Sequence, residues 1–236
     1  MPYGRWRAKV APTGLGRNVG RALRLCGVYL VIKQEIMEQE KFTTKRYTMA
    51  EYMALEMRSD VRHEFFEGEV FAMAGASIRH NLLIGNCYLA LRTGLRGSTC
   101  RVLTESVQLA VEHGRYYNYP DVAVTCAPAD LLAERTIESP VLLIEVLSKS
   151  TANRDRSWKF NQYKQLPSLQ HYLLVSQTTC LVEWYRREES GVWSFTPLTL
   201  FTDELFIPEL GTTLCLQDIY EDVGVTQMTI HPDPEE

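Results

Sequence analysis

The chain has 236 residues, which one α/β domain can accommodate, and its 45% hydrophobic and 23% charged residues are ordinary for a globular protein. No apolar run approaches the length needed to cross a bilayer, so we expect a soluble, cytoplasmic protein with no membrane partner. The formal net charge of −4 excludes a generally basic surface, so a nucleic acid would have to bind through a local basic patch or through bound cations.

The N-terminal segment differs in charge from the rest of the chain. Residues 1–36 carry seven basic residues and one acidic residue, and a short apolar stretch within them faintly resembles a secretory signal. No small-residue cleavage site follows that stretch, so we favour a translation start at Met37 over a targeting role. We expect residues 1–40 to be an extension outside the core, residues 41–223 to form one domain, and residues 224–236 to be a disordered tail.

The cysteines give no sign of a structural metal site. They are scattered along the chain without the CxxC spacing of zinc ligands, and several lie in apolar segments. We therefore expect all of them to be reduced, buried small hydrophobic residues, as is usual in a cytosolic protein. They are Cys26, Cys87, Cys100, Cys126, Cys180 and Cys215.

In the first half of the chain, capping and turn residues predict a helix, a hairpin and a longer helix. Thr48 and Glu51 have the spacing of a capping box, which predicts a helix over residues 49–57. The Glu67-Gly68 turn signal lies between aromatic and apolar runs and predicts a β-hairpin. Ser77 can cap a helix that ends near Leu95, with apolar residues at helical spacing.

Strands follow. Residues 102–111 alternate between apolar and polar side chains and predict one strand, and residues 121–125 predict another. Residues 141–147 are almost continuously apolar, which is typical of a central strand buried on both faces. Residues 150–164 predict a helix that ends before Pro167, and residues 171–176 predict the next strand.

A strand, a helix and a strand within so few residues favour a βαβ unit, in which the two strands pair in parallel. Hairpin segments at residues 180–186 and 192–200 and a short helix at residues 216–220 complete the pattern. The fold class is therefore α/β.

Two carboxylates stand out chemically. Glu145 interrupts an apolar strand, where an ionised carboxylate is costly unless it is paired or binds a metal; alternatively it lies at the exposed end of the strand. Asp121 opens a strand directly after Pro120, which fixes its own backbone. Two carboxylates on neighbouring strands would make an oxygen site suited to Mg²⁺ or Mn²⁺, with a phosphate supplying further ligands.

Lys159 is the candidate cation. It lies in the predicted helix after Glu145's strand, on one stripe with Asp155 and Tyr163. Because helical side chains lean towards the N-terminus, Lys159 could reach an attacking water or a phosphate at the end of that strand. The alternative is an ordinary surface pair with Asp155.

These residues resemble a known superfamily. Pro120-Asp121 followed by Ile144-Glu145-Val146 resembles the paired motif of the PD-(D/E)xK, or restriction-endonuclease-like, nucleases. A wider set over residues 45–223 resembles the Uma-two family of bacterial proteins regarded as endonucleases. That set comprises Arg62-His-Glu-Phe-Phe-Glu-Gly-Glu-Val70, His80, Pro120-Asp121-Val122, Ile144-Glu-Val-Leu-Ser-Lys-Ser-Thr151, and Asp155, Lys159 and Tyr163 at spacings of four.

The resemblance implies a restriction-endonuclease-like core, with a mixed central β-sheet flanked by helices and additional β-hairpins. It also implies dependence on Mg²⁺ (or Mn²⁺) and a homodimer. The superfamily lysine expected two residues after Glu145 is replaced by Leu147. In this family the lysine has moved to the following helix, which matches Lys159, and Lys149 is the rival.

Further residues are accessory candidates. Glu64 matches an acidic residue that often supports the metal in the superfamily, although alone it is a charge in a hairpin. His80 shares a helix stripe with apolar residues, where a histidine is usually a packed core residue, and Tyr163 completes the helix motif.

The local sequence also offers a basic patch. Basic residues outnumber acidic ones over residues 149–164 and could contact phosphates, although a solvated helix face explains them nearly as well.

We expect a metal-dependent endonuclease that hydrolyses phosphodiester bonds of nucleic acid, DNA rather than RNA, with Asp121, Glu145 and Lys159 as catalytic residues and the two acids as metal ligands. The alternative is a catalytically inactive module of the same fold that binds nucleic acid or protein. A third possibility, a phosphatase for small substrates, would need a closed pocket.

Overall fold

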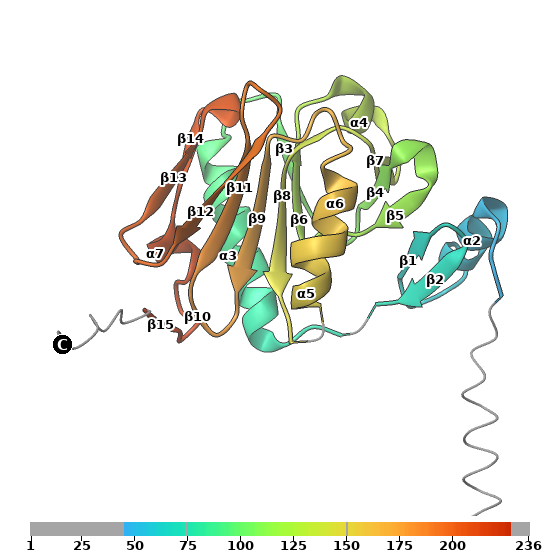
Figure 1. The fold of residues 1–236 in the computed structure, drawn as a ribbon, viewed down its shortest axis with the longest axis horizontal. Helices are drawn as coiled ribbons and strands as arrows, with labels where there is room; N and C mark the ends of the chain where they lie inside the picture. Colours follow the sequence, from blue (N-terminus) through green and yellow to red (C-terminus); the bar gives the residue numbers. More distant parts are fainter. Residues whose placement is uncertain (1–44, 74, 150, 228–236) are drawn as a thin grey trace, which may run out of the picture. The chain divides into compact units, whose positions relative to one another are not determined.

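The computed structural model describes residues 45–73, 75–149 and 151–227. Within these residues, a six-stranded mixed sheet has the order β12-β11-β9-β8-β6-β3, and only β8 and β9 pair in parallel (Figure 1). Its strands are β3 (Arg101–Thr104), β6 (Val122–Thr125), β8 (Pro140–Leu147), β9 (His171–Ser176), β11 (Val182–Arg187) and β12 (Trp193–Leu198).

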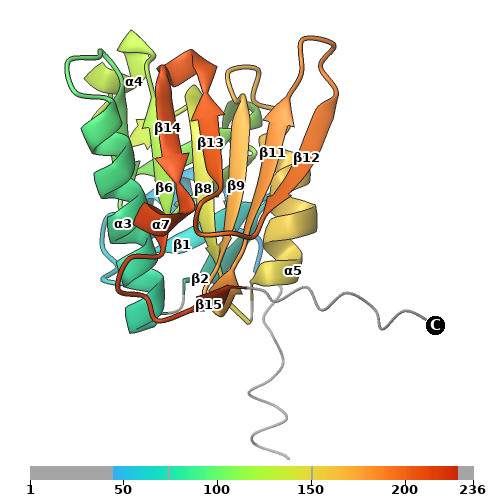
Figure 2. The ribbon, with the colours of Figure 1, turned by 90° about the vertical axis from the view of Figure 1, so that its left-hand side faces the viewer.

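Helices cover both faces of this sheet, as Figure 2 shows from the side. One face packs against α3 (Ile78–Gly94), α7 (Leu216–Ile219) and the hairpin of β13 (Glu204–Ile207) and β14 (Thr212–Cys215). The other face packs against one helical segment made of α5, the π-helical turn η2 and α6. Its parts are α5 (Ala152–Arg154), η2 (Asp155–Lys159) and α6 (Phe160–Tyr163).

The described residues also form a second, five-stranded sheet and a small two-stranded one. The five-stranded sheet has the order β2-β1-β5-β4-β7, and β10 pairs with β15. The strands are β1 (His63–Phe66), β2 (Glu69–Ala72), β4 (Gln108–Val111), β5 (Tyr116–Asn118), β7 (Thr136–Ile137), β10 (Thr179–Cys180) and β15 (Thr226–Gln227). The remaining helical elements are α2 (Met49–Glu56), α4 (Pro128–Leu132), and the 3₁₀ turns η1 (Glu112–Gly114) and η3 (Pro208–Leu210).

Local sequence signals predicted several of these elements correctly. Thr48 and Glu51 form the capping box of α2, and Ser77 caps α3. Glu67 and Gly68 both have positive φ, as a two-residue turn between β1 and β2 requires. The βαβ unit is also confirmed, since β8 and β9 pair in parallel. The fold class is the predicted α/β arrangement, with a mixed sheet flanked by helices and additional hairpins.

The predicted strand over residues 102–111 is wrong, because the segment divides between the two sheets. β3 pairs with β6, and β4 pairs with β5 and β7. Glu105, between them, has a φ of 31°, a left-handed backbone conformation that ends the first strand. Alternation of apolar residues cannot reveal such a break, because each half keeps the pattern.

The C-terminal boundary also differs from the prediction. Thr226 and Gln227 lie in the predicted tail but pair with β10 as β15, so the ordered chain continues past residue 223. The predictions for residues 1–40, including the start at Met37, and for residues 228–236 lie outside the described residues. In the described part of the chain, no helix is both long and apolar enough to cross a membrane.

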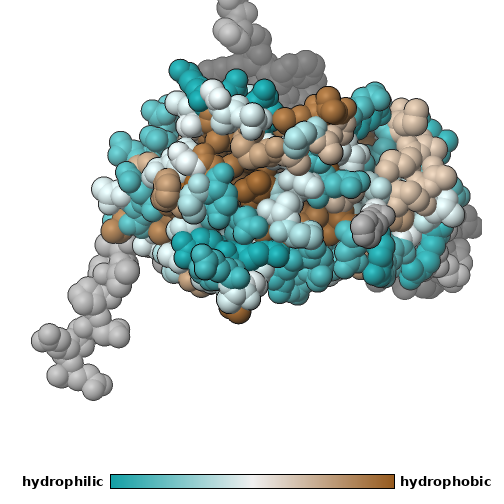
Figure 3. All heavy atoms as spheres, turned by 90° about the horizontal axis from the view of Figure 1, so that it is seen from above, coloured by the Kyte–Doolittle hydropathy of each residue, from teal (hydrophilic) through white to brown (hydrophobic). Residues whose placement is uncertain are grey.

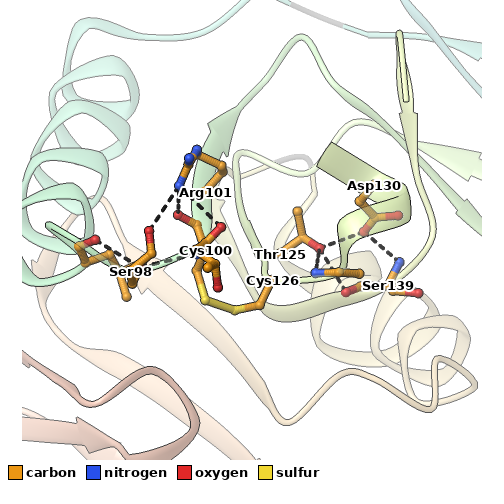
Figure 4. Close-up of a disulfide and its surroundings, with 10 residues drawn as sticks. Ser98, Cys100, Arg101, Thr125, Cys126, Asp130 and Ser139 are labelled. Atoms are coloured by element: carbon orange, nitrogen blue, oxygen red, sulfur yellow. Dashed lines mark hydrogen bonds between the residues drawn. A yellow bond between two sulfur atoms is a disulfide. The ribbon is translucent and has the colours of Figure 1, made fainter. Parts of the chain in front are cut away.

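The cysteine prediction is wrong at one pair. Cys100 and Cys126 form a disulfide (Figure 4). Cys100 precedes β3, Cys126 follows β6, and the neighbouring pair Arg101 and Thr125 are in register, so the antiparallel ladder brings the two Cα atoms to 4.0 Å. A separation of 26 residues carries no sequence signal for this pairing. Cys87 and Cys180 are reduced and buried, as predicted, and Cys215 is reduced but partly exposed.

A buried histidine makes the stability of the fold dependent on pH. His171 is fully buried, its Nδ1 accepts a hydrogen bond from Trp184 Nε1 at 3.1 Å, and its Nε2 lies 2.6 Å from Glu209 Oε2. Burial lowers the pKa of His171 below its ordinary 6.5, despite the opposing effect of Glu209. The folded protein therefore holds this ring neutral at pH values where the unfolded chain takes up a proton.

We expect the free energy of unfolding to fall as the pH drops below about 6.5, because the unfolded state then binds more protons. One such proton contributes a slope of up to about 1.4 kcal/mol per pH unit. Urea unfolding between pH 7.5 and 5 checks this in wild type and in His171→Gln, which should show a shallower slope. Equal slopes would contradict the assignment.

Candidate active site

Asp121 and Glu145 lie opposite each other at one end of the central sheet. β6 and β8 are antiparallel, with Val122 paired with Ile144, so the next pair in this register is Asp121 and Glu145. This end is the lower edge of β8 in Figure 1. Figure 3 views the opposite end, where apolar residues are scattered among polar ones.

Alternation along β8 gives the orientation of Glu145. Ala123, Leu143 and Leu147 belong to the core beneath the α5–η2–α6 segment, and side chains alternate along a strand. Glu145 therefore projects towards that segment, whereas Asp121, in the bend before β6, contacts His80 of α3 and the backbone of Val146. Asp121 and Glu145 are buried, at 9% and 3% exposure.

Lys159 occupies the centre of an acidic cluster. Its Nζ lies 3.1 Å from Glu145 Oε1, 3.3 Å from Asp155 Oδ1 and 3.4 Å from Glu64 Oε1, and the lysine side chain is only 7% exposed. The pair with Asp155 is thus buried, and the alternative of an ordinary surface pair is excluded. The π-helical turn from Asp155 to Lys159 is a local departure of the kind that often occurs at functional sites.

Two neutral side chains orient the glutamate. The Tyr163 hydroxyl donates a hydrogen bond of 2.7 Å to Glu145 Oε1, and Asn118 Nδ2 donates to both the same oxygen and the Tyr163 hydroxyl. The helix motif indicated Tyr163 as an accessory residue, whereas Asn118 gives no sequence signal, because a single asparagine in a three-residue strand forms no pattern. Within the described residues, no hydrogen bond or ion pair reaches Glu145 Oε2.

His80 supports the aspartate from the first turn of α3. Its Nε2 lies 3.2 Å from Asp121 Oδ1, and the backbone N–H of Val146 donates to Asp121 Oδ2 at 2.7 Å. Burial lowers the pKa of His80, but the hydrogen bond and charge of Asp121 outweigh it, so the pKa lies above its ordinary value. The helix stripe suggested a packed core histidine, whereas the structure places His80 at the site.

The basic patch predicted over residues 149–164 is largely neutralised. Arg154 Nη2 lies 2.6 Å from Glu64 Oε2, Arg156 forms an ion pair with Glu183, and Lys159 is enclosed by acids. Lys149, the rival to Lys159, is exposed, and within the described residues no ion pair of it is present. β8 ends at Leu147, so the strand does not carry Lys149 onto the face of Glu145.

Burial and charge shift the protonation of the central pair. Burial raises the pKa of Glu145 to about 8; the charges of Asp121 and Asp155 add to this effect, and Lys159 opposes it. Burial lowers the pKa of Lys159, but Glu145 and the other surrounding acidic groups outweigh it and raise that pKa well above its ordinary value. Lys159 is therefore a permanent cation at neutral pH.

An open cleft of about 1000 Å³ gives access to these groups. Its lining includes candidate residues from β1, α3, β8 and η2, together with one residue just before β6 and one just after β8. They are Glu64, His80, Asp121, Glu145, Lys149 and Lys159. These predicted residues thus converge on one cleft. Tyr163 is fully buried and does not line the cleft, but it donates a hydrogen bond to Glu145.

Comparison with known proteins shows the family of this chain. Residues 49–216 match the Uma2 family, described as "Putative restriction endonuclease". The chain is 33% identical over 170 residues to "Uncharacterized protein slr1290" of Synechocystis sp., covering 72% of this chain and 89% of that protein. It is 34% identical over 158 residues to "Uncharacterized protein sll1609" of the same organism, covering 66% of this chain and 89% of that protein.

A solved structure shares the fold. It is a "putative nuclease belonging to DUF820" from Anabaena variabilis, with a TM-score of 0.61 and 16% sequence identity, and the match covers 75% of this chain and 99% of that one. At this identity the likeness concerns the fold alone, whereas the family match spans most of the chain. The chain belongs to the Uma2 family, and its fold is that of the structurally characterised Anabaena relative.

Proposed function

We propose that this protein is a divalent-metal-dependent endonuclease that hydrolyses phosphodiester bonds of DNA. The observation that carries the proposal is the placement of Asp121 opposite Glu145, with Lys159 Nζ 3.1 Å from the glutamate, on the wall of an open cleft. The family description supports a nuclease and favours DNA over RNA. An open cleft suits a polymer better than the closed pocket that a small-substrate phosphatase needs.

The donor atoms fit a magnesium or manganese ion. Asp121 and Glu145 offer carboxylate oxygens, and Glu145 Oε2 is the oxygen that the described residues leave without a hydrogen bond. The described residues contain no cluster of three or more metal-ligating side chains, so water and phosphate oxygens would complete the coordination. When bound, such an ion supplies Lewis-acid stabilisation of phosphoryl charge and makes water more acidic.

The remaining residues have distinct roles in this proposal. Lys159 is permanently charged, so it acts as a cation that orients the attacking water and stabilises developing phosphoryl charge rather than as a base. Tyr163 and Asn118 fix the orientation of Glu145, and His80 fixes that of Asp121. Glu64 holds Lys159 in place. We further propose a cytoplasmic homodimer.

A second candidate is a catalytically inactive module that binds nucleic acid or protein. The pairing of Arg154 and Arg156 with acidic residues favours its protein-binding form, because these two cations are already neutralised and offer little to a phosphate. The endonuclease would cleave a phosphodiester bond, whereas the binding module would leave it intact.

We expect purified protein to nick and linearise supercoiled DNA in millimolar Mg²⁺ or Mn²⁺, and to leave it intact in EDTA. Asp121→Asn should lower cleavage on the order of a hundredfold or more, since one metal ligand is lost. Gel assays with supercoiled DNA, linear DNA and RNA measure this result. Cleavage that persists in EDTA, or in Asp121→Asn at the wild-type rate, would contradict the site; no cleavage with any metal favours the binding module.

A further inference from the structure

A second hollow of about 390 Å³ lies beside the active-site cleft. It is lined by Phe66, Glu69, Phe71, Arg154 and Trp158. Phe71 and Arg154 also line the active-site cleft, so the two depressions adjoin each other. A substrate strand in the cleft could therefore extend a neighbouring group into the hollow.

The β1–β2 hairpin presents the same face to both depressions. In its register Phe66 pairs with Glu69, and Glu64 pairs with Phe71, so these four side chains share one face of the hairpin. Glu64 contacts Lys159 in the cleft, while the other three line the hollow. Figure 1 shows this hairpin next to the α5 segment.

Three aromatic rings and a guanidinium group line the hollow. The rings of Phe66 and Trp158 meet edge to face, with centroids 4.9 Å apart. The Arg154 guanidinium carbon lies 4.6 Å from the centroid of Trp158 and 5.0 Å from that of Phe71. Phe71 is 40% exposed, so part of its ring is free to contact another molecule.

The charges in the hollow select an uncharged occupant. Arg154 is already paired with Glu64 at 2.6 Å and Glu69 with Arg46 at 3.8 Å, so the hollow offers no net positive charge and a phosphate gains little binding free energy there. The guanidinium in the wall repels a cation. A planar neutral ring gains the most binding free energy, because aromatic and guanidinium planes stack on the face of any nucleobase.

We propose that this hollow binds an unpaired nucleobase of the substrate strand, next to the cleaved phosphodiester. The inference rests on the proposed action on nucleic acid and adds a substrate class to it. Bases inside a duplex cannot present their faces to protein rings without leaving the stack. The protein therefore prefers single-stranded or locally unpaired DNA to perfectly paired DNA.

The test separates base contacts from phosphate contacts. Full-length protein in EDTA is titrated into fluorescein-labelled oligodeoxythymidine of about 12 nucleotides, a length within the usual site size for single strands, and into an abasic strand of equal length. Fluorescence anisotropy reports binding without cleavage. We expect the thymidine strand to bind on the order of tenfold more tightly than the abasic strand, the usual effect of stacking one base.

Substitutions of Phe71 test whether the preference for the thymidine strand arises in the hollow. Phe71→Leu keeps an apolar side chain without a ring and should remove most of the preference, whereas Phe71→Trp should retain it. Phe195→Leu is the matched control, since Phe195 is a 53%-exposed ring on β12 and does not line the hollow. Its preference should equal that of wild type.

The outcomes distinguish the two proposals. Protein that cleaves plasmid DNA but binds thymidine and abasic strands equally, or binds neither, overturns the base site and leaves the nuclease standing. Protein that prefers thymidine strands through Phe71 but cleaves nothing overturns the nuclease and keeps the base site. A preference that survives in Phe71→Leu overturns the placement in this hollow.

Discussion

Lys159→Met is expected to lower DNA cleavage on the order of a hundredfold to a thousandfold, the usual effect of removing one group that stabilises transition-state charge. It should also lower the free energy of unfolding by about 3–5 kcal/mol, the usual cost of breaking a buried ion pair. Lys159 is 7% exposed and contacts Glu64, Glu145 and Asp155, so its removal leaves buried carboxylates without their shared cation. Plasmid cleavage and urea unfolding measure the two effects.

Two control variants separate catalysis from stability. Lys149→Ala removes the rival lysine, which is exposed, and should retain wild-type cleavage and stability. The double variant Lys159→Met/Glu145→Gln should be more stable than Lys159→Met alone, because one uncompensated carboxylate is gone, yet it should remain inactive. If Lys149→Ala were inactive and Lys159→Met active, the catalytic role would pass to Lys149.

The carboxylate pair was predictable from sequence because its signals are local. An acid inside an apolar run indicated Glu145, and a proline before a short strand indicated Asp121. The capping residues and the Glu67-Gly68 turn were predictable for the same reason, since each depends on neighbours a few residues away.

Contacts between distant segments were not predictable. Asn118 meets Glu145 because β5 belongs to a second sheet that ends beside β8, and Arg154 meets Glu64 across 90 positions of sequence. Both depend on how the two sheets pack. The Cys100–Cys126 disulfide likewise follows from the register of β3 and β6 rather than from cysteine spacing.

The placement of Lys149 and Lys159 relative to Glu145 required both the local sequence and the tertiary structure. Sequence spacing placed either lysine near Glu145, and the family resemblance favoured Lys159. In the structure β8 ends at Leu147, and the π-helical turn holds Lys159 over the carboxylates. A turn of this kind depends on tertiary contacts, so helical periodicity alone could not predict it.

Divalent metal should stabilise the folded protein, and Glu145→Gln should lose that effect. An ion that binds only the folded state at about 100 times its dissociation constant adds about 2.7 kcal/mol. Because the pKa of Glu145 is raised to about 8, protons compete with the metal, so stabilisation should be larger at pH 8.5 than at pH 6.5. Thermal melting in Mg²⁺, Mn²⁺ and EDTA at both pH values measures these effects.

The metal-free behaviour of Glu145→Gln supplies an independent check. A raised pKa means that the folded state prefers the neutral glutamate, so its contribution to stability falls as the pH rises from 4.5 towards about 8. Glutamine carries no charge and should remove this dependence, which leaves the variant at least as stable as wild type in EDTA at pH 8. Its Tm should then be the same with and without metal. Should Glu145→Gln gain as much stability from metal as wild type does, the ion binds elsewhere, and the binding module replaces the nuclease as the better account of this protein.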